Sequence, residues 1–96
     1  MRFEWDDTKA ASNAKKHGVT FGKAITAFDD PFALITLDAK HSTTERREWL
    51  IGESDVGVLV VVFTIRQPGN IYRVISARKA KKRERNNYEE IKGLSV

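Results

Sequence analysis

The run from Gly57 to Arg66 constrains the fold more than any other part of the sequence. Its letters are GVLVVVFTIR, rich in β-branched residues that favour strands. Successive side chains of a strand point to opposite faces, so one face of this strand carries Leu59, Val61, Phe63 and Ile65. The residues between them are largely apolar too, with Thr64 as the exception, and a strand that is largely apolar on both faces is typical of the interior of a sheet. We therefore expect this strand to be central.

Three further segments have strand character and are separated by polar or glycine-bearing turns. They span residues 32–38, 46–52 and 71–78. Short connections between consecutive strands predict an antiparallel meander. The alternation at residues 3–5 predicts an additional short strand at the edge of the sheet.

Helical signals precede and follow the strands. Asp6 and Asp7 indicate a helix start and Gly18 its end, and Thr20 indicates a second helix that ends before Pro31. An amphipathic helix is expected over residues 79–91. We predict an α+β fold in which an antiparallel sheet packs against two N-terminal helices and is followed by a C-terminal helix. A length of 96 residues fits one domain over residues 1–96.

Composition excludes several classes of protein. The chain has no cysteine and two histidines, which excludes a disulfide scaffold, a thiolate metal site and a cysteine nucleophile. It has neither a phosphate-cradling glycine loop nor metal-ligand spacing, so we expect no cofactor and no metal. An acidic, polar start and the lack of a membrane-length apolar run predict a cytoplasmic protein without a membrane partner.

Positive charge is concentrated at the C-terminal end. Up to Asn70 the chain has nine basic and ten acidic residues, and after it eight basic and three acidic residues. Such a basic segment attracts polyanions, nucleic acid first among them. The alternative is a helix face that is simply solvated, and composition does not choose between the two.

Arginine and serine side chains at strand ends are the main candidates for chemistry. Strict alternation places Tyr72, Val74, Ser76 and Arg78 on one face of their strand, and Arg66 ends the preceding strand. Arginine suits a phosphate ligand because its planar fork makes paired charge-assisted hydrogen bonds. The alternative roles are an exposed strand-end charge for Arg78 and a capping hydroxyl for Ser76.

Other polar and aromatic residues have a structural and a functional interpretation. Glu45 is a general base for a ribose hydroxyl or an ion-paired surface carboxylate. His41 lies in a polar loop, where it shuttles protons or is merely exposed. Glu84 pairs with one of the arginines or with a neighbour along its own helix. Trp5 and Trp49 we assign to packing.

Several short motifs follow one another along nearly the full length of the chain. They are FEWD at 3–6, Asn13, the Lys16 to Val19 run KHGV, Phe21, Ala24, DP at 30–31, ER at 45–46, IG at 51–52, ISARKA at 75–80 and ERNNYE at 84–89. In these motifs and their order the chain resembles the BrnT-type toxins.

The resemblance implies a RelE-like fold and the ribonuclease half of a type II toxin–antitoxin pair. Such toxins inhibit translation and growth by cutting RNA without a metal. The implied partners are RNA as substrate, a ribbon-helix-helix antitoxin, and operator DNA only through the antitoxin complex. The implied catalytic residues are Glu45, Arg66, Ser76 and Arg78, with Glu45 as base or orienting group. For RNA binding we assign Lys16, His17, Arg73 and Lys79, the first two of which contact either RNA or the antitoxin.

Two alternatives to an enzyme remain open from the sequence. One is a module that binds nucleic acid through phosphates without cutting it, for which affinity falls steeply with salt. The other is a co-repressor subunit that reaches DNA only with its partner.

Overall fold

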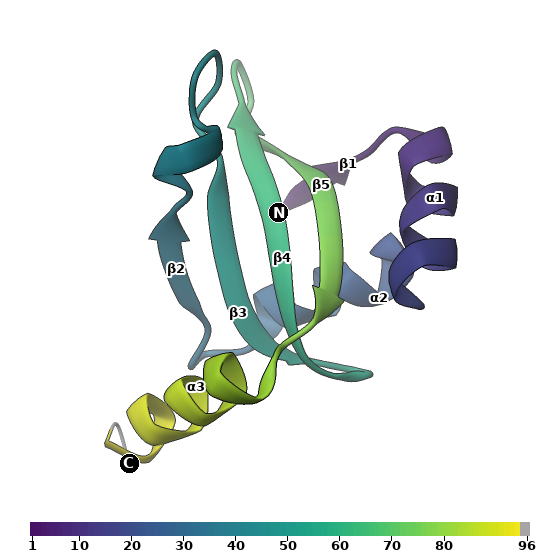
Figure 1. Ribbon diagram of the computed structural model, residues 1–96. Helices are drawn as coiled ribbons and strands as arrows, with labels where there is room; N and C mark the ends of the chain where they lie inside the picture. The colour runs from purple at the N-terminus through teal and green to yellow at the C-terminus, as the bar shows by residue number, and fades with distance from the viewer. Residues whose placement is uncertain (95–96) are drawn as a thin grey trace.

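The computed structural model describes residues 1–94 and has an α+β architecture with one mixed five-stranded sheet and three α-helices. The strands lie in the order β1-β5-β4-β3-β2 (Figure 1). The elements are β1 (Arg2–Glu4), α1 (Asp7–His17), α2 (Phe21–Ala24), the 3-10 helix η1 (Ile25–Asp29), β2 (Leu34–Leu37), the 3-10 helix η2 (Ala39–His41), β3 (Glu48–Ser54), β4 (Gly57–Arg66), β5 (Ile71–Lys79) and α3 (Lys82–Leu94).

The sheet is antiparallel from β2 to β5, and β4 is its central strand, as the sequence predicts. The prediction of a wholly antiparallel sheet is wrong at one edge. There β1 runs parallel to β5, with Phe3 opposite Tyr72. Strand β1 pairs with β5, from which it is far apart in the sequence. No short turn connects the two strands, so none dictates the direction of β1.

Each face of β4 lies in its own hydrophobic cluster. Leu59, Val61 and Phe63 pack with residues of α2 and η1 behind the sheet in the view of Figure 1. On the opposite face, Val58 and Val60 pack with Tyr88 of α3. All five of these strand residues are at most 8 % exposed. Burial of this apolar surface from both sides is the main stabilising contribution to the sheet.

Helix α1 begins and ends where its capping residues predict. The Asp6 carboxylate accepts a hydrogen bond from the Lys9 backbone N–H at 2.9 Å. Gly18 closes the helix at φ 70°, a left-handed conformation that glycine adopts without a steric penalty, and its N–H donates to the Ala14 carbonyl at 2.8 Å.

The second predicted helix is shorter than expected, because the α-helix stops at Ala24 and continues as η1. A 3-10 helix places residues three apart on one line, and Ala24 and Ala27 are both 0 % exposed. The Ala27 carbonyl oxygen would lie 3.0 Å from a Cβ at Gly52 of β3. The close approach of η1 to the sheet therefore requires a glycine at Gly52.

Helix α3 begins at Lys82, three residues later than predicted. Lys79 still belongs to β5, and the Ala80 N–H donates to the Val58 carbonyl at 3.0 Å. The buried Tyr88 anchors this helix, since its hydroxyl donates to the Asp30 carboxylate. Burial alone would raise the pKa of Asp30, but hydrogen bonds from the backbone of Glu53, from Tyr88 and from the backbone of Phe32 outweigh it and lower that pKa.

A β-bulge in β5 changes which residues share a face. Val74 lies opposite Phe63 whereas Ser76 lies opposite Val62, so Ile75 is the extra residue. Tyr72 and Val74 therefore face the cluster behind the sheet, and Ser76 points to the other side. The predicted common face of Tyr72, Val74, Ser76 and Arg78 is wrong, because strict alternation fails at a bulge.

Asn13 joins α1 to β5 by hydrogen bonds in the interior. Its amide nitrogen donates to the carbonyls of Val19 and Ala77 at 3.0 and 2.8 Å, and its amide oxygen accepts from the Ala77 N–H at 3.1 Å. The residue is 7 % exposed. Buried polar groups that lose their partners are costly, so this residue fixes where α1 sits.

We predict that Asn13→Ala lowers the free energy of unfolding by about 1 to 3 kcal/mol, because it leaves the Ala77 N–H and two carbonyls without their partner. Urea unfolding followed by circular dichroism measures the change. Ser12→Ala, on the exposed side of the same helix, is the control and should leave the midpoint nearly unchanged. Equal midpoints for the two variants would contradict the bridging role.

Candidate functional site

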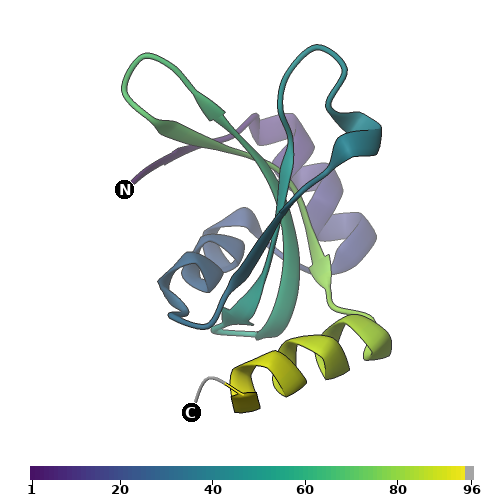
Figure 2. The ribbon, with the colours of Figure 1, turned by 90° about the vertical axis from the view of Figure 1, so that its left-hand side faces the viewer.

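The candidate site is the part of the front face of the sheet that α3 leaves uncovered. Figures 1 and 2 show α3 across the lower end of the sheet, with α2 on the opposite side. Paired residues of neighbouring antiparallel strands point to the same side. We call the resulting surface the open sheet face and define it by Trp49, Val62, Arg73, Ser76 and Arg78.

Arg78 is the best-oriented cation on the open sheet face. Its Nη1 and Nη2 donate to the two carboxylate oxygens of Glu84 at 2.7 and 2.9 Å. Ser76 lies two residues before Arg78 on β5 and points to the same side. The hydrogen bonds that Arg78 donates to Glu84 raise the pKa of Arg78, against the effect of burial. The guanidinium is thus held charged and in one orientation, with 27 % of the side chain exposed.

Glu84 makes both contacts that the sequence left open. It pairs with Arg78, and its Oε1 accepts from the Lys81 backbone N–H at 2.8 Å, which caps α3. Arg78 lowers the pKa of Glu84 to about 2, with the Lys81 N–H adding to the effect and burial opposing it. The carboxylate therefore connects the first turn of α3 to the open sheet face.

Arg66 and Arg73 lie together at the other end of the face. Both approach Glu4 of β1, whose Oε2 is 3.5 Å from Nη1 of Arg66 and 2.5 Å from Nη1 of Arg73. Arg73 lies opposite Thr64 and Arg78 lies opposite Val60. Four residues of strand separate these positions, a distance of about 13 Å. The sequence-predicted arginines therefore share a face without forming one cluster.

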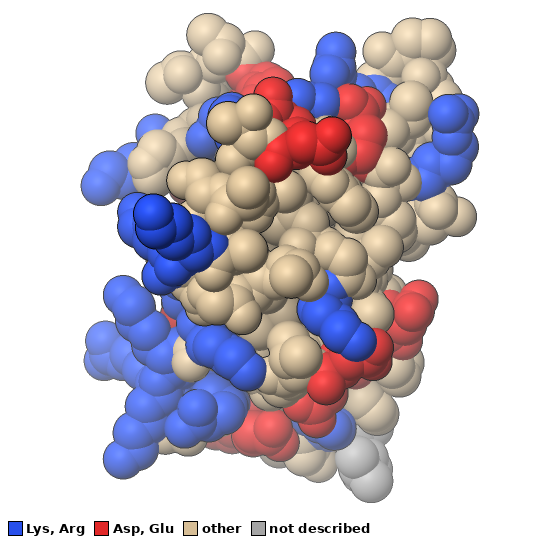
Figure 3. Space-filling model, turned by 90° about the vertical axis from the view of Figure 1, so that its right-hand side faces the viewer, with Lys and Arg blue, Asp and Glu red and all other residues tan. Residues whose placement is uncertain are grey.

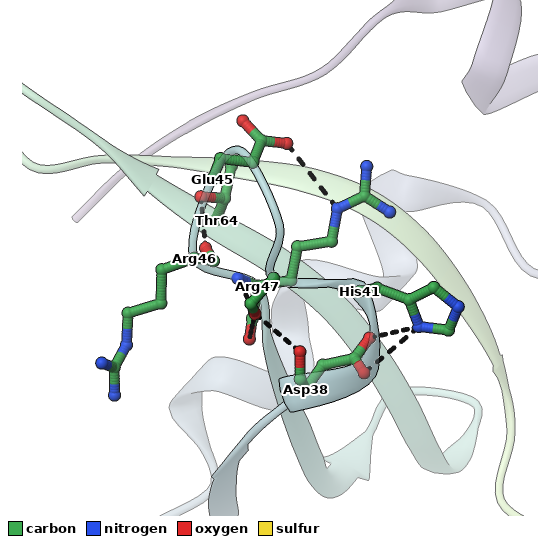
Figure 4. Close-up of polar contacts among 7 residues, drawn as sticks. Asp38, His41, Glu45, Arg46, Arg47 and Thr64 are labelled. Carbon is green, nitrogen blue, oxygen red and sulfur yellow. Dashed lines mark hydrogen bonds and ion pairs between the residues drawn. The ribbon is translucent and has the colours of Figure 1, made fainter.

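Glu45 belongs to the loop above the sheet, where its Oε1 lies 3.7 Å from Nε of Arg47 (Figure 4). The carboxylate is 47 % exposed. Thr64 attaches this loop to β4, because its hydroxyl donates to the Arg46 carbonyl at 2.6 Å. Glu45 therefore lies beyond the Arg73 end of the face and does not contact Arg78.

Lys16 and His17 end α1 and line a shallow hollow of about 210 Å³ together with Ser76. Lys79 is directed elsewhere, since its Nζ donates to the Val56 carbonyl in the β3–β4 turn. Basic residues also precede and begin α3. Figure 3 shows Lys and Arg side chains gathered along one margin of the side that carries α1, apart from the acidic side chains.

The sequence did not indicate how Asp38, His41 and Trp49 are arranged. Nδ1 of His41 lies 2.9 and 3.2 Å from the two carboxylate oxygens of Asp38. These residues and Trp49 line a hollow of about 430 Å³ at the edge of the open sheet face. The assignment of Trp5 to packing fits its edge-on contact with Phe21 at 5.9 Å, whereas Trp49 also borders this hollow. In the sequence, the only sign of this hollow was the polar loop that contains His41.

Two other features of the described residues bear on chemistry. Within residues 1–94, no group of three or more His, Cys, Asp or Glu side chains is placed to hold a metal ion. In the same part of the chain, no helix is long and apolar enough to cross a membrane.

We predict that Glu84→Gln removes a pH-dependent contribution to stability. A carboxylate whose pKa is lowered stabilises the native state above its unfolded pKa of about 4.5, and the effect is lost as the pH falls towards 2. At pH 7 the variant should be less stable by about 1 to 3 kcal/mol, and this difference should shrink at pH 3. Urea unfolding at both pH values measures it. Glu90→Gln on the exposed side of α3 is the control, and a pH-independent deficit would contradict the ion pair.

Comparison with known proteins supplies the family. No protein of curated function matches the chain. Residues 5–84 match the family described as the ribonuclease toxin BrnT of type II toxin–antitoxin systems. The matched range includes Arg66, Ser76, Arg78 and Glu84, and it covers most of the chain. The chain therefore belongs to the BrnT family of ribonuclease toxins of type II toxin–antitoxin systems.

Proposed function

We propose that this protein is a metal-independent endoribonuclease that inhibits translation and growth by cutting RNA bound across the open sheet face. The observation that carries the proposal is the fork of Arg78, held by two hydrogen bonds to Glu84 at the margin where α3 leaves the sheet uncovered. A guanidinium fixed in this way matches the oxygens of a phosphodiester. Because it is oriented before RNA arrives, little ordering is required on binding.

RNA supplies its own nucleophile, the 2′-hydroxyl, so a protein needs only a base, cations near the phosphate and a proton for the leaving oxygen. In our assignment Arg66 and Arg78 hold phosphates, Ser76 donates or accepts a hydrogen bond, and Glu45 acts as base or orienting group. Arg66 lies six residues along β4 from Val60, the residue opposite Arg78. This separation of about 20 Å assigns Arg66 and Arg78 to different phosphates of the same strand of RNA.

Flanking RNA is assigned to Lys16, His17, Arg73 and Lys79. Lys16 and His17 border the hollow beside Ser76, which supports contact with the same strand of RNA. Arg73 lies on the open sheet face itself. The Lys79 ammonium is bound to the Val56 carbonyl, so it must leave that contact before it binds a phosphate.

We propose further that residues 1–96 form a single RelE-like toxin domain. The order of elements, two helical segments before the meander and one helix after it, supports this assignment.

A type II toxin implies an antitoxin that is a protein, and we propose one of the ribbon-helix-helix class. The resemblance of the sequence motifs supports that class. Operator DNA would then be bound only by the complex, since the DNA-binding element belongs to the antitoxin.

We predict that Arg78→Ala abolishes cleavage of a mixed-sequence RNA by the purified protein in excess chelator, in assays with and without ribosomes. The unaltered protein should give ends with a 2′,3′-cyclic phosphate and a 5′-hydroxyl. Gel analysis and mass spectrometry of the ends measure both. Glu84→Gln keeps the Arg78 cation but removes the carboxylate that orients it. This variant should give an intermediate rate because positioning contributes to catalysis.

Three outcomes would contradict parts of this proposal. RNA that stays intact in every assay while binding falls steeply with salt would favour a nucleic-acid-binding module. Cleavage that requires a metal after stripping would overturn the mechanism. If the Arg78→Ala protein is unfolded, Glu84→Gln tests the role of Arg78 instead. Full activity of Glu84→Gln would contradict the role of the oriented fork.

A further inference from the structure

The Asp38–His41 pair lies outside the arginines assigned above and has the geometry of a proton-transfer group. His41 ends η2, and 54 % of its side chain is exposed, whereas 6 % of the Asp38 side chain is exposed. Figure 4 shows the imidazole directed away from the loop, with Nδ1 on the carboxylate and the other ring nitrogen outward. The buried Asp38 carboxylate thus orients the exposed His41 ring.

The ionisation of Asp38 fixes which nitrogen of His41 carries the proton. The indole N–H of Trp49 lies close enough to lower the pKa of Asp38, although its geometry is not that of a hydrogen bond. His41 adds to this effect and burial opposes it. An ionised carboxylate only accepts hydrogen bonds, so Nδ1 must carry the hydrogen. In the neutral ring, Nε2 is then an unprotonated base that faces solvent.

The loop holds this pair firmly. The Asp38 N–H donates to the Arg47 carbonyl at 2.8 Å, which closes the connection between β2 and β3. The Ser42 hydroxyl donates to the Asp38 carbonyl at 2.6 Å and accepts from the Arg47 N–H at 2.9 Å. The carboxylate is therefore positioned by backbone contacts on both sides of η2.

Arg47 closes the same loop as the pair, because its carbonyl accepts from the Asp38 N–H. Figure 4 shows the Arg47 guanidinium on the same side of the loop as the His41 ring, with Arg46 on the other side. Arg47 is 33 % exposed, and its Nε approaches Glu45 at 3.7 Å. Besides the imidazole, the charged groups of this loop are Asp38, Lys40, Glu45, Arg46 and Arg47.

The adjoining hollow has room for part of a nucleotide. It measures about 430 Å³ and is lined by the apolar side chains of Leu37, Ala39 and Trp49 as well as by His41. Aromatic and apolar walls suit the faces of a nucleobase. Trp49 of β3 and Ser76 of β5 both lie opposite Val62 of β4. They are therefore in one row across the sheet, about 10 Å apart. A strand of RNA that crosses the sheet would connect the hollow with the Ser76 end of the face.

We propose that His41, oriented by Asp38, is the general base of the ribonuclease reaction and that the hollow takes the base of the nucleotide it deprotonates. This inference rests on the proposed function. Nε2 takes the proton of the 2′-hydroxyl, and the 2′-oxygen forms a bond to phosphorus. The bond from phosphorus to the 5′-oxygen breaks, and that oxygen keeps the electron pair and takes a proton from solvent. The imidazolium then returns its proton to solvent. Glu45 is in this case the orienting group, and Arg47 stabilises the negative charge on the phosphate.

We predict that His41→Ala lowers the rate of cleavage of a mixed-sequence RNA by about 100-fold or more, the range for loss of a general base. Affinity for a non-cleavable 2′-deoxy strand should change by less than about twofold, because the chemistry and not the binding is affected. Imidazole added to the buffer should restore part of the rate in His41→Ala. Asp38→Asn should lower the rate by about 10-fold or more, and Asp55→Asn, on an exposed turn away from the hollow, is its control.

The pH profile separates proton transfer from a structural role. A general base acts only in its unprotonated form, so the activity of the unaltered protein should fall as the solution is made more acidic. In His41→Gln that acid limb should be absent. A thermal melt of each variant shows whether it is folded, and an exposed imidazole should contribute little to stability.

The outcomes distinguish this inference from the proposed function. Wild-type rates in His41→Ala, with Arg78→Ala inactive, would overturn the role of His41 and leave the ribonuclease intact. Lost binding in His41→Ala, or the lack of imidazole rescue, would overturn proton transfer. Intact RNA with the unaltered protein, with and without ribosomes, would overturn both.

Discussion

The requirement to bury β4 on both faces determines the architecture of this protein. Its apolar side chains cannot be covered by one layer, so α2 and η1 pack on one side and α3 on the other. The helical segments behind the sheet cover most of their face, whereas the single helix in front covers one end. The uncovered remainder is the surface on which the charged residues gather. An open face is therefore a consequence of having one helix on that side.

Local signals in the sequence sufficed to predict the elements themselves. The capping residues Asp6 and Gly18 mark α1, and the two-sided apolar run marks β4 as central. The parallel pairing of β1 was not predictable, because it joins Phe3 to Tyr72 across almost the whole chain. The bulge at Ile75 has no local signature either, since it depends on how β5 aligns with β4.

The candidate site was predictable by residue type rather than by geometry. Arginines and Ser76 could be selected because their chemistry suits phosphate, but their common face required the bulge to be known. Asp38 and His41 lie three residues apart in a loop, where spacing alone does not predict contact. Asn13 belongs to a sequence motif, but its bridging role was not predictable because its partner Ala77 is 64 residues away. Contacts of this kind are set by packing, which a single sequence does not display.

The ion pair between Arg78 and Glu84 also couples the open sheet face to the docking of α3. Glu84 belongs to the first turn of α3, and Tyr88, which anchors this helix, follows one turn later. A movement of α3 away from the sheet would take the carboxylate from Arg78 while β5 stays paired with β4. The orientation of the guanidinium therefore depends on the packing of a helix that follows the sheet in the chain.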